Sequence, residues 1–531
     1  MNNNEATRKG NAILVFVAMG LGVLIGLMLA QSGGLKRNPS PQSTLQGKMD
    51  EVMTLVETNY VDSVDRDSLT DHLMSVMLSE LDPHSSYLSA KASLQAEEMM
   101  RGNFEGVGLV LHRQGDTCFV GQILPDGPSK GSGILPGDAI LTVDGKPVTG
   151  LASDSVVARL RGPRGTRVKL GIGRGSELAP KEFIINRGVV EHASLTCSTM
   201  LDDTTGYIML SSFTANSHNE FCNALIQLKS KGMRHLIFDL RGNGGGMLSS
   251  AVGIAGELLP KGSLIVYMEG AHSSRKELHS NGGGLFTTGR VTVLIDENSA
   301  SASEVVSGAL QDNDRALIAG RRSFGKGLVQ TDFSLSDGSS VLLTTARYYT
   351  PSGRCIQRSY NEGTAEYYRS YMQRLFDETY ADTAWAGVND STPYHTIGGR
   401  TVYGGGGITP DTILTYRKDP TFAYYNRLSA AGLINNTAFH YVRCHASELI
   451  SRYTDADAFC DHFQTPPSLL QELASRGEKA GIERNNRSLQ AQRTLLLTLM
   501  KAYIGQSLFG DDMFYRVYHT VDEDLQKIKH L

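Results

Sequence analysis

The chain has 531 residues, of which 40% are hydrophobic and 20% charged, so it is long enough for several domains and too apolar to be disordered throughout. Its net charge of -4 provides no bulk positive field, which argues against nucleic acid as a partner. Glycine is overrepresented, with 57 residues against a usual share of about 7%. Because glycine lets the backbone approach a ligand closely, clusters of glycine are the first places to look for a site.

An uncharged apolar segment, residues 12–30, lies close to the N-terminus. Its length approaches the ~20 residues that a helix needs to cross a bilayer. Arg8 and Lys9 precede it, which favours a cytoplasmic N-terminus. A cleaved signal peptide is the alternative, but its apolar region spans only about 7–15 residues. We therefore predict an uncleaved signal anchor and linker over residues 1–44, with the rest of the chain outside the cytoplasm, in the cell envelope.

The six cysteines contain no C-x-x-C pair, so we expect neither a zinc ribbon nor a thioredoxin-type site. Their wide spacing fits buried thiols or an occasional disulfide, and it selects no pairing. We predict no metal site.

Residues 45–100 are predicted to form a helical segment. Apolar residues recur there at intervals of three and four, as in Met49, Val52 and Val56. Residues 417–531 also have a helical pattern, without a motif that indicates a role. Helices at both ends of the core suggest self-association as a homodimer, through a surface that the sequence does not identify.

Residues 101–187 contain short strands separated by glycine-rich turns, including an Asp144-Gly145 turn between two strands. With the stretch Gly-Asp-Ala-Ile-Leu-Thr-Val-Asp-Gly, this segment resembles a PDZ domain. PDZ domains bind a peptide C-terminus by adding it as a strand to a sheet edge. A PDZ fold that serves only as a spacer is the alternative. The resemblance implies that the terminal carboxylate is bound by backbone N–H groups of the loop Gly106, Val107, Gly108 and Leu109.

Residues 188–416 alternate strands with helices, which predicts a layered α/β core. The buried strand at 235–240 runs into the turn Asp-Leu-Arg-Gly-Asn-Gly-Gly-Gly at 239–246. Such a turn directs backbone N–H groups at one point and can hold an oxyanion. A phosphate loop is disfavoured, because no Gly-Lys-Ser/Thr follows and the glycine spacing differs.

Ser301 follows the predicted strand 291–295 and enters a helix. The N–H dipoles at a helix N-terminus stabilise negative charge near such a hydroxyl. Ser301 and Glu304 also have the spacing of a capping box, a purely structural alternative that is compatible with catalysis.

Lys326 lies between Gly325 and Gly327, where tight backbone packing can bury its amine. A lysine acts as a base at neutral pH only if burial lowers its pKa, and a serine hydroxyl needs a base to become nucleophilic. Serine–lysine pairs achieve this without histidine. A solvent-exposed turn lysine is the alternative. No histidine lies in the three stretches around the glycine turn, Ser301 and Lys326, which weakens the case for a Ser-His-Asp triad.

Taken together, these three stretches resemble the carboxy-terminal processing (tail-specific) serine proteases, and so do residues 81–88, 348–354 and 405–411. The resemblance implies an α/β multi-domain protein with a ClpP/crotonase-like protease core and a β-rich PDZ domain with two short helices. It implies that Ser301 is the nucleophile, Lys326 the general base and Gln330 the residue that orients the lysine amine. It also implies an oxyanion hole and the absence of any cofactor. That hole would consist of the backbone N–H groups of Gly245, Gly246 and Ala302.

We therefore expect a membrane-anchored, periplasmic serine endopeptidase that cleaves proteins near accessible C-termini. Its PDZ domain would recognise the substrate C-terminus. Arg161 occupies a position that resembles a PDZ–core contact, so we expect a regulatory role for it, with a solvent-exposed turn arginine as the alternative. Gly244 stands where the family often has Pro or Ser. The non-enzymatic alternative is an inert PDZ scaffold with a protease-like core. An acyl-CoA enzyme of the crotonase type would leave the PDZ domain and the anchor unexplained.

Overall fold

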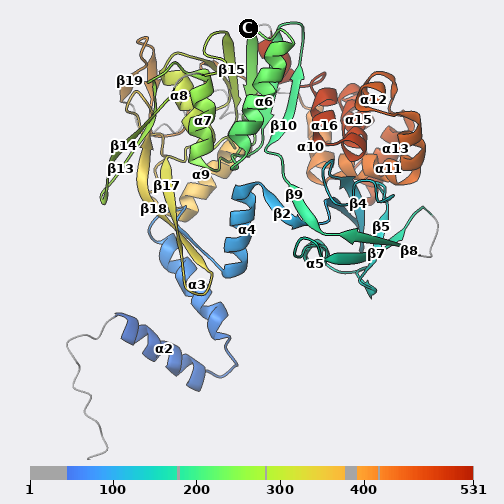
Figure 1. Cartoon of the computed structure of the whole chain (residues 1–531), viewed down its shortest axis with the longest axis horizontal. Helices are drawn as coiled ribbons and strands as arrows, with labels where there is room; N and C mark the ends of the chain where they lie inside the picture. The colour runs from blue at the N-terminus through green and yellow to red at the C-terminus, as the bar shows by residue number, and fades with distance from the viewer. Residues whose placement is uncertain (1–44, 176–179, 282–283, 377–391, 416–418, 530–531) are drawn as a thin grey trace, which may run out of the picture. The chain divides into compact units, whose positions relative to one another are not determined.

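The computed structural model describes residues 45–175, 180–281, 284–376, 392–415 and 419–529 (Figure 1). The chain divides into two compact units, Met1–Met74 and Ser75–Leu531. The smaller unit contains α2 (Leu45–Asn59) and the first part of α3 (Arg66–Ser79). The predicted anchor at 12–30 lies outside the described residues. Within the part of the chain that is described, no helix has both the length and the apolar character to cross a membrane.

A six-stranded sheet forms the centre of the larger unit, in the order β10-β11-β12-β15-β16-β21. All its strands are parallel except β10, which runs antiparallel to β11. The predicted strands at 235–240 and 291–295 are the central pair, β12 and β15. The strands are β10 (Leu195–Met200), β11 (Thr205–Leu210), β12 (His235–Asp239), β15 (Arg290–Ile295), β16 (Leu317–Gly320) and β21 (Thr412–Ile413).

Both faces of this sheet are covered, which explains why β12 is apolar and buried at successive positions. One face packs against α6 (Ser217–Ser230), α7 (Leu248–Leu258) and α8 (Ala302–Asp312). In Figure 1, α6 and α7 lie side by side along the strands. The other face packs against Leu525 and Ile528 of the last helix, α17 (Glu523–Lys529). The layered α/β core predicted from strand–helix alternation is therefore confirmed.

A second, antiparallel sheet carries the segment that follows Lys326. Its order is β1-β18-β13-β14, and β17 also pairs with β18. Strand β1 comes from the N-terminal part of the chain, so residues near 86 lie next to the core. The strands are β1 (Ser86–Leu88), β13 (Leu264–Gly270), β14 (Ser273–His279), β17 (Leu328–Ser334) and β18 (Ser340–Tyr349), beside α9 (Thr364–Phe376) and the hairpin β19 (Pro393–His395) and β20 (Thr401–Tyr403).

The predicted PDZ segment folds as a sheet in the order β3-β4-β5-β7-β8, with its own buried core. The short pair β2–β9 joins both ends of this domain. Helix α4 leads into it. The elements are α4 (Ala90–Arg101), β2 (Asn103–Gly106), β3 (Leu109–Gln114), β4 (Thr117–Ile123), β5 (Ala139–Val143), β6 (Lys146–Pro147), α5 (Ser153–Leu160), β7 (Arg167–Gly173), β8 (Lys181–Asn186) and β9 (Gly188–Glu191).

The C-terminal region is helical, as predicted, and its helices share a hydrophobic core that includes Phe119 of the PDZ strand β4. The Arg443 guanidinium lies 3.7 Å from the centroid of the Phe119 ring. No sequence pattern predicts this contact between the PDZ domain and the C-terminal helical region. Besides α17, the helices are α10 (Phe422–Ala430), α11 (Leu433–Arg452), α12 (Ala456–His462), α13 (Ser468–Lys479), α14 (Asn486–Ala491), α15 (Arg493–Phe509) and α16 (Asp511–Tyr518).

Candidate active site

Ser301 occupies the turn between β15 and α8 with a strained backbone. Its φ of 55° and ψ of -112° are unusual for a residue with a side chain. Such conformations cost on the order of 1–3 kcal/mol and concentrate at functional sites. Ser301 is the N-cap of α8, so its hydroxyl lies at the positive end of the helix dipole.

The glycine turn after β12 lies directly against Ser301. Gly245 has a φ of 102°, and a Cβ added there would lie 2.8 Å from the Ser301 Cβ. Glycine is therefore required for the turn to approach the serine this closely. Arg241 Nε donates hydrogen bonds to both carboxylate oxygens of Asp239, at 3.0 and 2.9 Å, so these two residues brace the turn.

The three N–H groups assigned to the oxyanion hole differ in their hydrogen bonding. Gly245 N–H donates to the Asn243 side chain at 2.8 Å, so in this structure it is already occupied. Among the described residues, no hydrogen bond is recorded for the N–H groups of Gly246 and Ala302. Of the three donors, Gly245 N–H alone has a hydrogen-bond partner within the described residues, and the assignment of all three to an oxyanion hole stays a prediction.

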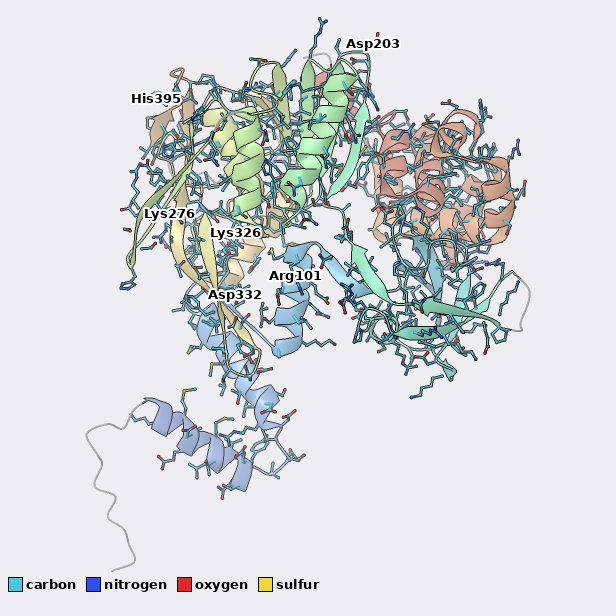
Figure 2. All side chains as sticks on the ribbon, viewed as in Figure 1. Arg101, Asp203, Lys276, Lys326, Asp332 and His395 are labelled. Atoms are coloured by element: carbon cyan, nitrogen blue, oxygen red, sulfur yellow. The ribbon has the colours of Figure 1, made fainter. Side chains whose placement is uncertain are left out.

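Lys326 (labelled in Figure 2) lies two residues before β17, in a tightly packed loop. A Cβ added at Gly327 would lie 2.8 Å from the Gln357 backbone nitrogen, as expected if this glycine serves close packing. Burial lowers the pKa of the Lys326 amine, while the carboxylates of Glu304 and Asp82 act in the opposite direction. Burial thus shifts the pKa of this amine in the direction that a lysine base requires.

Glu304 connects the serine and lysine segments. Its side chain is fully buried, and one carboxylate oxygen accepts the N–H groups of both Ser301 and Lys326, at 2.8 and 2.9 Å. The other oxygen accepts Ser323 Oγ at 2.5 Å and Gly325 N–H at 2.7 Å. The predicted capping partner of Ser301 thus also positions the backbone of Lys326.

The structure does not place Gln330 on the lysine amine. Gln330 Nε2 donates to Thr344 Oγ1 at 3.3 Å. Within the described ranges, no hydrogen bond joins the Lys326 amine to either Gln330 or Ser301. Glu304 therefore brings the backbones of the serine and lysine segments together, and the Ser301 side chain takes part in the capping box at the start of α8.

Asp82 and His84 lie close enough to influence Lys326, and the sequence had suggested no role for either. Burial, aided by the Lys326 charge, lowers the pKa of His84 to about 4, so its imidazole is neutral at physiological pH. His84 Nε2 contacts Tyr367 Oη at 3.0 Å. Asp82 accepts the Ser85 hydroxyl at 2.6 Å. Both residues belong to the stretch 81–88 that supported the family resemblance, which was the available signal.

The C-terminal helical region also reaches the glycine turn. Asp522 Oδ2 accepts from Arg241 Nη2 at 2.7 Å, and Asp524 Oδ2 accepts from Arg321 Nη1 at 2.9 Å. Arg241 is therefore held between Asp239 and Asp522, which lie far apart in the sequence. No sequence pattern identified the two C-terminal aspartates.

In the PDZ domain, the predicted carboxylate loop is tightly held. Gly108 has a φ of 73°, and an added Cβ would lie 2.6 Å from the Gly127 Cα. The Val107 carbonyl accepts the N–H and the hydroxyl of Ser129, at 3.0 and 2.7 Å. The adjoining strand β3 is an edge strand of the domain's sheet, as peptide addition requires.

Arg161 ends the PDZ helix α5 and forms an ion pair with Glu98 of α4. Its guanidinium also lies 4.7 Å from the centroid of the Phe104 ring in β2. The partners described for Arg161 thus lie on α4 and β2 rather than within residues 188–416. All six cysteines are free thiols.

Comparison with known proteins agrees with this architecture. Peptidase family S41 matches residues 204–365, the PDZ domain family matches residues 96–173, and a family of unknown function, DUF8443, matches residues 424–510. The chain is 32% identical to a carboxy-terminal-processing protease of Bartonella bacilliformis, over 65% of this chain and 80% of that protein. It is 36% identical to a carboxyl-terminal-processing protease of Synechocystis sp., over 53% of this chain and 67% of that protein.

Among solved structures, the photosystem II D1 C-terminal processing protease is 31% identical, over 59% of this chain and 84% of that chain, with a TM-score of 0.34. On those matches, together with the S41 core and the PDZ domain, the chain belongs to the carboxy-terminal-processing serine proteases of peptidase family S41.

Proposed function

We propose that Ser301 and Lys326 form the catalytic dyad of this protease. The observation that carries the proposal is the shared acceptor: one buried carboxylate oxygen of Glu304 binds the backbone N–H groups of both residues. The strained backbone of Ser301 and the lowered pKa of Lys326 support the same assignment.

In this mechanism the neutral Lys326 amine takes the Ser301 Oγ proton as Oγ attacks the scissile carbonyl. The resulting oxyanion faces the N–H groups of Gly246 and Ala302, which stabilise it electrostatically. The lysine then protonates the leaving amine. Water, deprotonated by Lys326, hydrolyses the ester on Ser301 and regenerates the free hydroxyl.

We further propose that substrate binding brings the two side chains together, with Gln330 orienting the lysine amine. The absence of a Lys326–Ser301 hydrogen bond in the described structure motivates this step. The substrate's free C-terminus would add to β3 with its carboxylate at the loop 106–109. Arg161 would transmit this binding through its ion pair with Glu98 of α4.

We also propose that residues 12–30 anchor the protein in the inner membrane, with the protease in the periplasm. Self-association as a homodimer is a further proposal. The apolar N-terminal segment and the helical ends of the chain motivate these two ideas.

The dyad is tested by Ser301→Ala and Lys326→Ala, with cleavage of a peptide carrying a free, apolar C-terminus as the assay. Both variants should fold and lose cleavage, and a serine-reactive fluorophosphonate should label the wild type at Ser301. A matched Ser352→Ala variant should keep both properties. Cleavage by Ser301→Ala, or labelling at a different serine, would refute the assignment, and an inert scaffold would form no adduct.

Peptide recognition is tested separately by amidating the C-terminus of the same peptide. A PDZ loop that binds the terminal carboxylate should give a clear loss of kcat/KM with the amide. Equal cleavage of the free-acid and amidated peptides would show that the PDZ domain does not recognise the substrate C-terminus, and it would not bear on the Ser301–Lys326 dyad. Arg161→Ala should alter this acid-over-amide preference if the arginine transmits binding.

A further inference from the structure

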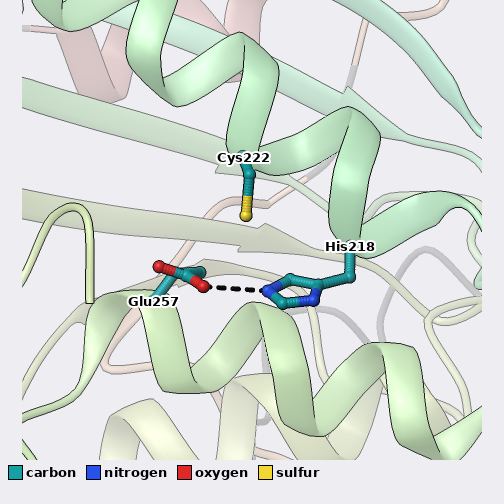
Figure 3. Close-up of side chains that lie close together, drawn as sticks. All are labelled: His218, Cys222 and Glu257. Carbon is teal, nitrogen blue, oxygen red and sulfur yellow. Dashed lines mark hydrogen bonds and ion pairs between the residues drawn. The ribbon is translucent and has the colours of Figure 1, made fainter. Parts of the chain in front are cut away.

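Three side chains with metal-binding atoms converge between α6 and α7, on elements that the proposed mechanism does not use. His218 and Cys222 are four residues apart on α6 and therefore share one face of that helix. Glu257 lies in the last turn of α7. Figure 3 shows the three side chains pointing toward one another in the space between the helices. Their ligand atoms all lie within 4.8 Å of one another.

Surrounding groups hold two of these side chains in place. Glu257 Oε2 accepts the Leu285 N–H at 2.9 Å, while Oε1 lies 2.9 Å from His218 Nε2. A Cβ added at Gly253 of α7 would lie 2.8 Å from the His218 ring. Glycine is unfavourable inside a helix, and here it provides the room that the imidazole occupies. The carboxylate is thus oriented by a backbone donor, an arrangement typical of metal ligands and their outer partners.

We propose that His218, Cys222 and Glu257 bind a divalent transition-metal ion of the zinc class. An imidazole nitrogen, a thiolate and a carboxylate oxygen are all zinc ligands, with bonds of about 2.0–2.3 Å, and water would complete the tetrahedron. Calcium and magnesium prefer oxygen ligands, so the nitrogen and sulfur atoms disfavour both ions.

Binding would replace the His218–Glu257 hydrogen bond with two metal bonds. The Cys222 thiol would form a metal–sulfur bond and release its proton to solvent. In tetrahedral zinc sites the ligand atoms are about 3.3–3.7 Å apart, as follows from the bond lengths. The present separations, from 2.9 Å up to 4.8 Å, therefore require only small side-chain rotations.

The consequence would be a link between two helices on the same face of the core sheet. Helix α7 starts directly after the glycine turn, at Leu248, and its last turn carries Glu257. The ion would therefore stabilise the protease core from a position outside the Ser301–Lys326 site. The site's role is binding and stability, and it is independent of the proposed dyad.

The full-length protein, stripped with a chelator, would be titrated with Co²⁺ as a spectroscopic substitute for zinc. We expect one equivalent to bind and to produce both a thiolate-to-cobalt charge-transfer band and the visible bands of a tetrahedral site. Cys222→Ser should lose the charge-transfer band. His218→Ala should weaken binding by more than about 100-fold, the upper end for loss of an outer partner. The matched control Cys444→Ser, which removes an exposed thiol, should behave as wild type.

A second measurement keeps the proposal testable if a variant folds poorly. Zn²⁺ should protect Cys222 of the wild-type protein from alkylation, read by mass spectrometry, while Cys444 continues to react. Zn²⁺ should also raise the melting temperature of wild type and of Cys444→Ser. An unchanged cobalt spectrum in Cys222→Ser, or no stoichiometric binding by the wild type, would overturn the proposal.

Discussion

Replacing Glu304 with glutamine tests the shared acceptor most directly. Each carboxylate oxygen of Glu304 accepts two hydrogen bonds, and the residue is fully buried. An amide has one oxygen, so in either orientation two donors face an NH₂ group. A buried donor without a partner costs about 1–3 kcal/mol, which predicts a loss of about 2–6 kcal/mol in unfolding free energy. Burial raises the pKa of Glu304, so removing its charge offsets part of this cost, and we expect the lower end of the range.

The same substitution should change the pH dependence of catalysis in a defined direction. The Glu304 carboxylate opposes the lowering of the Lys326 pKa, so its removal lowers that pKa further. A base with a lower pKa becomes neutral at lower pH. The acidic limb of the kcat/KM profile should therefore move to lower pH in Glu304→Gln, even though the activity at the plateau falls.

Glu220→Gln is the matched control. One carboxylate oxygen of Glu220 accepts Ser194 N–H, Ser194 Oγ and Leu195 N–H, so an amide oxygen can keep all three bonds. This variant should lose less stability and leave the acidic limb in place. The assays are denaturant unfolding and peptide cleavage between pH 5 and 10. Wild-type stability in Glu304→Gln, or an acidic limb that stays in place or moves to higher pH, would show that Glu304 is not the shared acceptor that sets the Lys326 environment.

Three further outcomes are expected. Gly245→Ala should strongly reduce cleavage, because the φ of Gly245 is 102° and the added Cβ would lie 2.8 Å from the Ala300 oxygen. The control Gly244→Ala places its Cβ in open space and should stay active. Equal kcat/KM values for the two variants would contradict this prediction. Burial lowers the pKa of Lys326 in the folded state below its ordinary value of 10.5. Between the folded and unfolded pKa values the unfolded state binds more protons, so the free energy of unfolding should rise with pH across that window. Lys326→Met should abolish this rise and be more stable than wild type at pH 7. Asp522→Asn weakens the bridge between Asp522 and Arg241, so the free energy of unfolding should fall by about 1–3 kcal/mol and kcat should fall more than KM changes. An unchanged kcat would argue against control of the glycine turn by the C-terminal region.

Much of the fold and of the proposed site was accessible from the sequence, because it depends on local pattern. Buried strands such as β12 are continuous apolar runs, and the turn that follows needs glycine wherever φ is positive. The spacing of Ser301 and Glu304 predicts a capped helix start, which the Glu304 hydrogen bond to the Ser301 N–H confirms. The PDZ strands and the helical C-terminal region were predictable in the same way, from local hydrophobic periodicity and turn residues.

The antiparallel second sheet could not be predicted in the same way. Strand β1 pairs with β18 although about 250 residues separate them in the chain, and pairing of this kind is set by the tertiary arrangement. The proposed metal-binding cluster could not be predicted from spacing, because its side chains come from two helices and form no C-x-x-C or similar pattern.

Local sequence patterns were enough to identify a serine at a helix start, a lysine between glycines, and a glycine turn able to receive an oxyanion. The hydrogen-bond partners of these groups come from distant parts of the chain and are seen in the folded structure alone. Gly245 N–H is occupied by Asn243, Gln330 binds Thr344 rather than the lysine, and Asp522 reaches Arg241 from the far end of the chain. The physical reason is that a polar contact between distant residues needs one donor and one acceptor in place, and such a pair imposes no periodicity on the sequence.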